Sequence, residues 1–203
     1  MDVGCGTGSM LIAARDAGHN GRLYGLDPAP GMLAQARRRA YVEWVLGDLT
    51  SVKWDAEFDL VVMTGHAFQV FIEDDDICDA LARIHSALRP DGRFAFETRN
   101  PSARAWETEI RGTVDGTHGE KVSMRRKVTT PFNGRVISFS HTFQNASWDA
   151  PRVSHSTLRF IGKADLDAAL VQAGLVPEAQ FGDWDESPLT ETSPEIITIA
   201  RRI

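Results

Sequence analysis

The chain has 203 residues, of which 42% are hydrophobic and 25% charged, and its formal net charge is −6. This balance is typical of one globular domain, and the acidic excess is unlike that of a general nucleic-acid binder. No apolar run approaches the roughly 20 residues that span a bilayer. Cys5 and Cys78 fit neither a disulfide framework nor a metal site. We therefore expect a cytoplasmic monomer or homodimer that binds no membrane, nucleic acid or metal.

The first hundred residues alternate short apolar runs with helical patterns, which predicts βαβ units and a parallel sheet. Strands are expected at 1–3, 23–26, 42–46, 58–63 and 93–97. Helices are expected at 9–17, around 32–40, and from the acidic run 73–76 to residue 88, with a turn at 89–92 before the fifth strand. The basic runs 37–39 and 125–127 are expected to be exposed to solvent.

The pattern changes at about residue 101. Asn133-Gly134 between two extended runs predicts a hairpin, because both central residues must accept positive φ. Ile137, Phe139, His141 and Phe143 then alternate on one face, and 153–161 is a further strand. We expect an antiparallel insertion here, with His141 as a core histidine. A helix at 163–173 and strands at 176–181 and 195–200 end the chain.

A glycine-rich turn, Asp2-Val3-Gly4-Cys5-Gly6-Thr7-Gly8, lies between the first strand and the first helix. Glycines let a ligand lie against bare backbone, and the following helix N-terminus favours an anionic group. Dinucleotide enzymes also have such a turn, but their third glycine comes three residues after the second rather than two. Cys5 is expected to fill space within the turn.

Two further acids follow the next two strands. Asp27 ends the second strand, where an acid can accept both ribose hydroxyls of an adenosine. Asp48, just past the third strand, either accepts from an adenine amino group or stabilises a turn. With Asp2, these acids predict an adenosine site at the carboxyl ends of successive strands.

Together these segments resemble the class I S-adenosylmethionine-dependent methyltransferases. Residues 2–8 are similar to that family's first motif, 25–28 with 32–33 to its ribose segment, and 47–49 to its adenine segment; 58–62 and 88–93 match its fourth and fifth strand entries. The resemblance rests on specific motifs over residues 2 to about 97 and on the general layout of elements over residues 163–200. It implies S-adenosylmethionine as cofactor, bound by Asp2, Gly4, Cys5, Gly6, Gly8, Asp27, Pro28, Met32, Asp48, Leu49 and Thr64.

The resemblance also implies an α/β fold: a Rossmann-like, doubly wound, mostly parallel seven-stranded sheet of order 3-2-1-4-5-7-6, its last pair antiparallel. We expect one domain over 1–203. Residues 1–100 would form the cofactor-binding half, 101–160 the β insertion that covers the acceptor, and 161–203 the last helix and terminal hairpin. In the family the first strand is longer and follows helices. The first strand is thus expected to be truncated, with a coding region that begins upstream or a chain that is marginally stable and poorly active.

A narrower likeness concerns the acceptor. Residues 64–68 and 97–100 resemble segments of glycine and sarcosine N-methyltransferases, which implies that Asn100 contacts the acceptor. His66 replaces the asparagine usual there and is our candidate catalytic base, because histidine titrates near neutral pH; a packing role stays open. Glu97 is either a pocket carboxylate or a strand end.

The expected activity is methyl transfer by in-line displacement to a small-molecule acceptor, with amines among the candidate acceptors. The motif of enzymes that methylate nucleobases or glutamine amides is absent after the fourth strand. Two other hypotheses remain: a cofactor-binding but inactive methyltransferase-like protein, and an NAD(P)-dependent oxidoreductase, which the glycine spacing disfavours.

Overall fold

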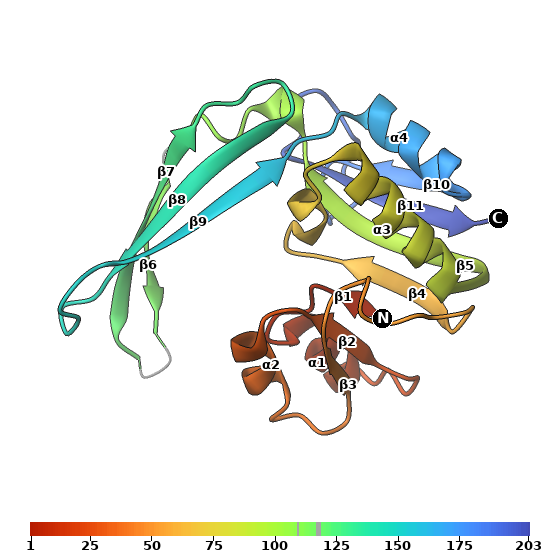
Figure 1. Ribbon diagram of the computed structural model, residues 1–203, viewed down its shortest axis with the longest axis horizontal. Helices are drawn as coiled ribbons and strands as arrows, with labels where there is room; N and C mark the ends of the chain where they lie inside the picture. The colour runs from red at the N-terminus through yellow and green to blue at the C-terminus, as the bar shows by residue number, and fades with distance from the viewer. Residues whose placement is uncertain (109, 117–118) are drawn as a thin grey trace.

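The computed structural model describes residues 1–108, 110–116 and 119–203 (Figure 1). A seven-stranded sheet, sheet A, forms the body, in the order β10-β11-β5-β4-β1-β2-β3. Strands β1 to β5 pair with one another in parallel, whereas β11 is antiparallel to both β5 and β10. The predicted order and its antiparallel last pair are confirmed, with β10 and β11 as the sixth and seventh strands.

The strands of sheet A are β1 (Asp2–Val3), β2 (Tyr24–Asp27), β3 (Glu43–Leu46), β4 (Phe58–Met63), β5 (Leu88–Arg99), β10 (Leu175–Phe181) and β11 (Glu195–Arg202). The α-helices are α1 (Ser9–Asp16), α2 (Pro30–Ala36), α3 (Asp74–Ala87) and α4 (Lys163–Gln172). Two short 3-10 helices, η1 (Ala67–Val70) and η2 (Pro101–Ala103), follow β4 and β5. No helix among the described residues is long and apolar enough to cross a membrane.

Two apolar clusters cover the two faces of sheet A. The larger one includes Ile84 of α3 and Leu166 of α4, and the smaller one includes Leu11 of α1 and Leu33 of α2. Successive side chains of a strand point to opposite faces, so the strands supply both clusters. Burial on both faces is the usual state of a parallel sheet, and it agrees with the doubly wound layout.

The centre of the sheet depends on a very short strand. Asp2 of β1 pairs with Gly25 of β2 and with Val62 of β4. The Met1 ammonium group donates to the Leu60 carbonyl oxygen at 2.7 Å, and burial lowers the pKa of that ammonium group to about 6. A cavity of about 430 Å³ lies beside Met1, lined by residues of α1, of β4 and of the segment that precedes β2. The residues of β1 that pair with β2 and β4 therefore lie immediately before the glycine turn.

Strand β5 is longer than predicted. The sequence indicated a turn at 89–92 and a strand at 93–97, and the structure assigns β5 to Leu88–Arg99 directly after α3. The register with β4 shifts between Leu88 and Arg93, and Asp91 has a positive φ of 60°, so the chain still bends locally there. Pairing with β4 ends at Phe96, and pairing with β11 continues to Arg99, which carries Glu97 and Arg99 to the edge where β4 ends.

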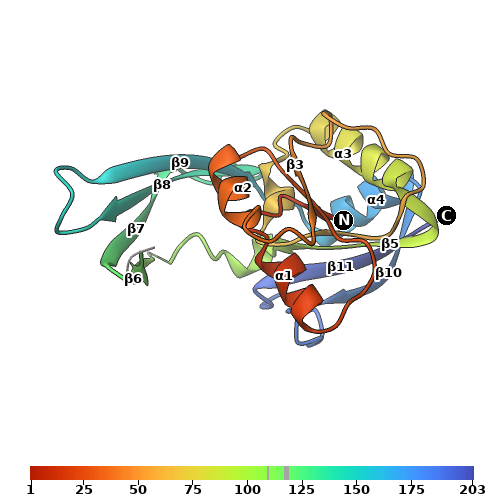
Figure 2. The same cartoon turned by 90° about the horizontal axis from the view of Figure 1, so that it is seen from below.

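The predicted insertion is a second sheet. Sheet B consists of β6 (Arg111–Asp115), β7 (Lys121–Thr130), β8 (Val136–Gln144) and β9 (Arg152–Arg159), antiparallel and in chain order. In both views it projects from the body as an arm, on the side away from the C-terminus (Figure 1, Figure 2). The hairpin at Asn133-Gly134 is confirmed, although only Gly134, and not Asn133, has the positive φ that was expected of both. The Asn133 side chain instead accepts from the N–H groups of Arg135 and Val136.

One face of sheet B, called here the inner face, is the more buried. It carries buried Ile137 and Phe139 and half-buried His141, as the alternation predicted. Arg126 of β7 lies opposite His141 in register and is also buried. The expectation that 125–127 are all exposed was therefore wrong at Arg126, because strand alternation turns the middle residue of the run inward.

Gln69 of η1 joins sheet B to the body. Its side-chain N–H donates to the carbonyl oxygen of Arg159, at the end of β9, at 2.7 Å. Its side-chain oxygen accepts from the Arg99 guanidinium at 3.0 Å. The Arg159 guanidinium in turn donates to Asp74 at 2.6 Å. The arm is thus held by polar contacts to η1 and α3.

Replacing Gln69 by Met should lower the free energy of unfolding by about 1–3 kcal/mol, because a buried carbonyl oxygen then loses its donor. Urea denaturation measures this difference. Gln172, exposed on α4, offers the same chemical change without a buried partner, and Gln172→Met should lie close to the parent. Equal effects of the two changes would show that the Gln69 bridge does not anchor the arm.

Candidate functional site

The predicted site residues gather at the edge of sheet A where β1, β2, β4 and β5 end. Gly4 follows β1, Asp27 ends β2 and Thr64 follows β4. The backbone N–H of Gly4 donates to the Leu26 carbonyl oxygen at 2.8 Å. A Cβ at Gly4 would lie 2.9 Å from the Cβ of Ala67. The glycine turn and the loop after β4 are therefore in direct contact, and a side chain at position 4 would force them apart.

Asp27 links the glycine turn to the start of α2. Its buried carboxylate accepts from the N–H of Gly6 at 2.7 Å and from the N–H of Ala29 at 2.8 Å. Each oxygen makes one of these bonds, and each keeps further acceptor capacity. Two acceptor positions therefore remain for the hydroxyl groups of a ligand.

The other glycines of the turn differ in their surroundings. A Cβ at Gly8 would lie 2.2 Å from the Trp44 ring, whereas a Cβ at Gly6 would meet nothing within 4 Å. Gly6 thus borders open space beside Asp27, where a ligand can lie against backbone. Cys5, between Gly4 and Gly6, is buried, and burial raises the pKa of its thiol to about 12, which agrees with a space-filling role.

Asp2 is a buried acid beneath the turn. Its side chain is 2% exposed, and its Oδ1 has no hydrogen-bond partner in the described part of the chain. Burial raises the pKa of Asp2 to about 7; the Met1 ammonium group opposes this rise and the Asp27 charge adds to it. A buried carboxylate oxygen without a donor is costly. A cationic ligand group would supply the missing partner.

Asp48 is held in a turn beyond β3. Its Oδ1 accepts from the hydroxyl and N–H groups of Thr50 and Ser51, and these bonds, led by the Thr50 hydroxyl at 2.6 Å, lower the pKa of Asp48. The side chain is exposed and Leu49 beside it is buried. The turn role is present, and the predicted adenine contact stays a prediction. The other predicted cofactor residues are exposed Pro28 and Met32 and half-buried Thr64.

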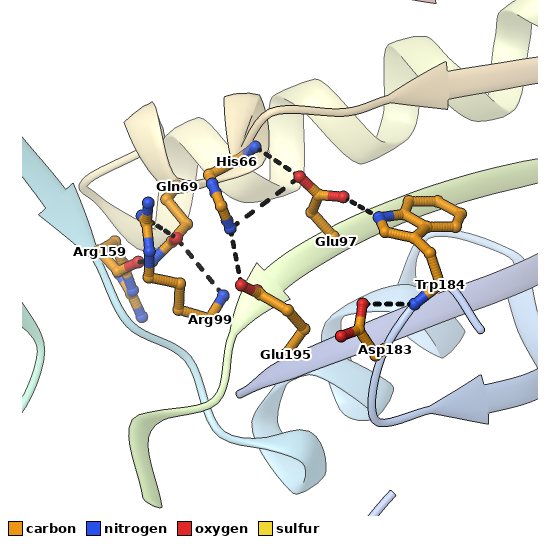
Figure 3. Close-up of polar contacts among 8 residues, drawn as sticks. All are labelled: His66, Gln69, Glu97, Arg99, Arg159, Asp183, Trp184 and Glu195. Atoms are coloured by element: carbon orange, nitrogen blue, oxygen red, sulfur yellow. Dashed lines mark hydrogen bonds and ion pairs between the residues drawn. The ribbon is translucent and has the colours of Figure 1, made fainter. Parts of the chain in front are cut away.

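His66 belongs to a second cluster at the same edge (Figure 3). Its backbone is left-handed, with φ of 64°, between β4 and η1. Its N–H donates to Glu97 Oε1 at 3.0 Å, and its ring Nε2 lies 2.9 Å from Glu195 Oε1 and 4.0 Å from Glu97 Oε1. Three elements thus bring an imidazole and two carboxylates together: the loop after β4, the end of β5 and the start of β11.

The surroundings of this cluster come from distant segments. Glu97 Oε2 accepts from the indole N–H of Trp184, a half-exposed side chain in the loop between β10 and β11 (Figure 3). Arg99 lies on the same face of β5 as Glu97 and donates to Gln69. The sequence left Glu97 open between two roles; in the structure it is buried, with both oxygens bonded. Sequence reasoning missed Glu195, Trp184 and Gln69.

Asn100 lies beyond the cluster, with its side chain directed into a loop. Its amide N–H groups donate to the carbonyl oxygens of Thr190, Glu191 and Ser193, at 3.1, 3.4 and 3.0 Å. Its side-chain oxygen accepts from the N–H of Ser102 at 3.1 Å. Asn100 therefore fixes the loop that leads into β11. Its contact with an acceptor stays a prediction.

Comparisons with known proteins agree with this geometry. A family model described as a methyltransferase domain matches residues 1–92. The cypemycin N-terminal methyltransferase of a Streptomyces species is 31% identical over 205 residues, which cover 100% of this chain and 82% of that protein. This chain belongs to the S-adenosylmethionine-dependent methyltransferase family.

Two further matches show how far the methyltransferase similarity extends. The aklanonic acid methyltransferase DauC of Streptomyces sp. (strain C5) is 38% identical over 105 residues, 47% of this chain and 46% of that protein, so the match spans about half of the relative. The structure of CalS10, an amino pentose methyltransferase from Micromonospora echinaspora with its cofactor bound, is 25% identical with a TM-score of 0.78. That match covers 100% of this chain and 82% of CalS10.

The residues of this methyltransferase fit S-adenosylmethionine, the cofactor of the family. The unpartnered oxygen of Asp2 suits the ammonium group of the cofactor, and the acceptor positions left on Asp27 suit the ribose hydroxyls. The open side of Gly6 lets the ligand approach the backbone. The hydrogen-bonding groups of Asp2 and Asp27 therefore match the ammonium group and the ribose hydroxyls of the cofactor.

Affinity for S-adenosylhomocysteine should rise with pH through the titration of Asp2. Because the pKa of Asp2 is raised to about 7 in the free protein, Asp2 binds a proton below that pH. A ligand ammonium group favours the charged carboxylate, so binding expels the proton. We expect affinity to fall up to about tenfold per pH unit below pH 7 and to level off above it. Isothermal titration calorimetry from pH 5.5 to 8.5 measures this.

Two variants distinguish the effect of Asp2 on the pH dependence of binding from the effects of other titrating groups. Asp2→Asn should bind more weakly at pH 8 and lose most of the pH dependence. Asp16→Asn, at an exposed position of α1, should keep the parent profile. A parent-like profile in Asp2→Asn would refute the assignment of Asp2 to the ammonium group.

Proposed function

We propose that this chain transfers a methyl group from S-adenosylmethionine to a small-molecule amine by in-line displacement. The observation that carries the proposal is the contact between the two clusters. Gly4 of the cofactor turn lies against Ala67, the residue after His66, which places His66 and Glu97 next to the cofactor turn. A nucleophile held at His66 would therefore lie beside the cofactor.

Methyl transfer from a sulfonium centre requires little of the chain beyond positioning the acceptor and the cofactor. When bound, the cofactor supplies a methyl group on a sulfonium centre whose leaving group is a neutral thioether. The chain holds the acceptor nitrogen in line with that methyl group, and such positioning is worth roughly 7–11 kcal/mol. An ammonium group must lose a proton before its nitrogen can attack, and His66 takes that proton.

The charges around His66 support an amine. Glu97 and Glu195 place two carboxylates within 4.0 Å of its ring nitrogen, and both favour a cation. By their names, the cypemycin enzyme acts on an N-terminus and CalS10 on an amino pentose, whereas the DauC enzyme acts on an acid. The matches to the cypemycin enzyme and to CalS10 cover all of this chain, and the match to DauC covers about half.

The inner face of sheet B is proposed to cover the acceptor. Burial lowers the pKa of His141, and the charges of Arg126 and Arg99 act in the same direction. Gln69 bonds both Arg99, at the end of β5, and Arg159, at the end of β9, so the base of the arm lies beside the end of β5. Half-buried His141 and Phe143 are therefore suited to contact an acceptor held between the arm and His66.

Replacing His66 by Asn should lower kcat for an amine acceptor by about 10²- to 10⁴-fold, the usual contribution of a general base. Asparagine tolerates the left-handed backbone, so the loop keeps its shape. The affinity for S-adenosylhomocysteine should change less than about threefold, because His66 faces the acceptor. S-adenosylhomocysteine release with pooled amines, carboxylates and phenols gives the rates, and calorimetry gives the affinity.

His155→Asn is the matched control, since His155 is exposed on β9. It should retain parental turnover. Equal losses of turnover and affinity in His66→Asn would remove His66 from the acceptor site. Absence of methyl transfer by the parent to every amine would contradict the proposed function.

A further inference from the structure

Glu195 is the principal partner of the His66 ring. It is the first residue of β11, where it pairs with Arg99 of β5. Its Oε1 lies 2.9 Å from His66 Nε2, and its Oε2 is buried with no hydrogen-bond partner in the described part of the chain. The described residues provide no cation within 4.0 Å of Glu195 other than this imidazole. Its Oε1 is therefore directed at His66, while its charge also acts on Arg99, its neighbour in register on β5.

The neighbouring charged groups are already engaged elsewhere (Figure 3). Glu97 bonds the backbone N–H of His66 and the Trp184 indole, and its nearer oxygen is 4.0 Å from Nε2. The Arg99 guanidinium donates to Gln69, and burial lowers the pKa of Arg99 despite the charges of Glu195 and Glu97. Glu97 thus shapes the loop, and Glu195 acts on the ring.

We propose that Glu195 is the positioning residue that makes His66 a base. A carboxylate at Nε2 keeps a proton on that nitrogen, which leaves the lone pair of the neutral ring on Nδ1, an atom for which the described residues supply no partner. The same carboxylate stabilises the imidazolium that forms when His66 takes a proton. This inference rests on the proposed function and deepens it.

The step balances without a further reactant. A proton passes from the acceptor ammonium nitrogen to His66 Nδ1. The freed lone pair on nitrogen forms the bond to the methyl carbon, and the carbon–sulfur pair leaves with the sulfur. The proton then passes from His66 to solvent. Because the Glu195 carboxylate stands behind the ring, the site favours primary or secondary amines that arrive protonated and disfavours carboxylates.

The test compares Glu195→Gln with the parent, and with Glu178→Gln as control. Glu178 is a carboxylate of β10 paired with Arg93 and Arg201, so its replacement removes the same charge away from the site. In Glu195→Gln we expect kcat to fall about 10- to 100-fold and the acidic limb of kcat/KM to move to lower pH. Affinity for S-adenosylhomocysteine and the melting temperature should stay near the parental values, and Glu178→Gln should match the parent throughout.

A second readout needs no turnover. Nitrogen-15 NMR of the histidine rings, with the His66 signal assigned by its loss in His66→Asn, reports the tautomer and the protonation midpoint. The parent should show the Nε2–H tautomer at pH 8. Glu195→Gln should lower the protonation midpoint, and Glu195→Ala should yield a mixture of tautomers.

Three outcomes overturn the inference. The first is a parental pH profile and NMR titration in Glu195→Gln, and the second is a parental tautomer in Glu195→Ala. The third is a loss of kcat in Glu195→Gln that is matched by losses of cofactor affinity and melting temperature, while the acidic limb of kcat/KM stays at its parental pH. The last outcome would give Glu195 a merely structural role. If the parent methylates no amine but the NMR changes occur, the positioning of His66 stands and the proposed function fails.

Discussion

The pair of hydrogen bonds accepted by Asp27 is the constraint on which the cofactor half of the site depends. The two donors, Gly6 and Ala29, belong to different βα units, and one buried carboxylate holds both at 2.7–2.8 Å. Hydrogen bonds to a charged group contribute about 1.5–3 kcal/mol each. Asp27 therefore sets the distance between the glycine turn and α2, and it does so with the same oxygens that remain free to accept from a ligand.

The second half of the site follows from strand order. The sheet reverses its winding between β1 and β4, and ligands of such sheets bind outside the carboxyl ends of the strands at that point. His66 follows β4 and Glu97 lies near the end of β5, so both reach this crevice. Glu195 reaches it for a different reason: β11 runs antiparallel, so its first residue lies at the edge where the parallel strands end.

Local patterns predicted most of the fold and the cofactor motif. The glycine turn, Asp27 and the hairpin at Asn133-Gly134 depend on short-range spacing that the chain displays directly, whereas the strand order followed from the resemblance to the methyltransferase family. The sequence could not indicate Glu195, because its partner His66 is 129 residues away and only the antiparallel pairing of β11 brings them together. Sequence reasoning predicted an exposed Arg126, because the run of three basic residues obscured the alternation of buried and exposed residues along the strand. It ended β5 at Glu97, two residues too early, because the strand continues to Arg99 through pairing with β11, which is distant in the sequence.

The most direct test of the central claim is the affinity of Asp27→Ala for S-adenosylhomocysteine, measured by titration calorimetry. Loss of two charge-assisted acceptors predicts a loss of about 2–4 kcal/mol of binding free energy, roughly 30- to 1,000-fold in Kd. Asp59→Ala is the control, since Asp59 is an exposed carboxylate paired with Arg89 at the opposite end of β4. Circular dichroism of both variants establishes that they are folded. Parental affinity in a folded Asp27→Ala would contradict the assignment of this edge of the sheet as the cofactor site.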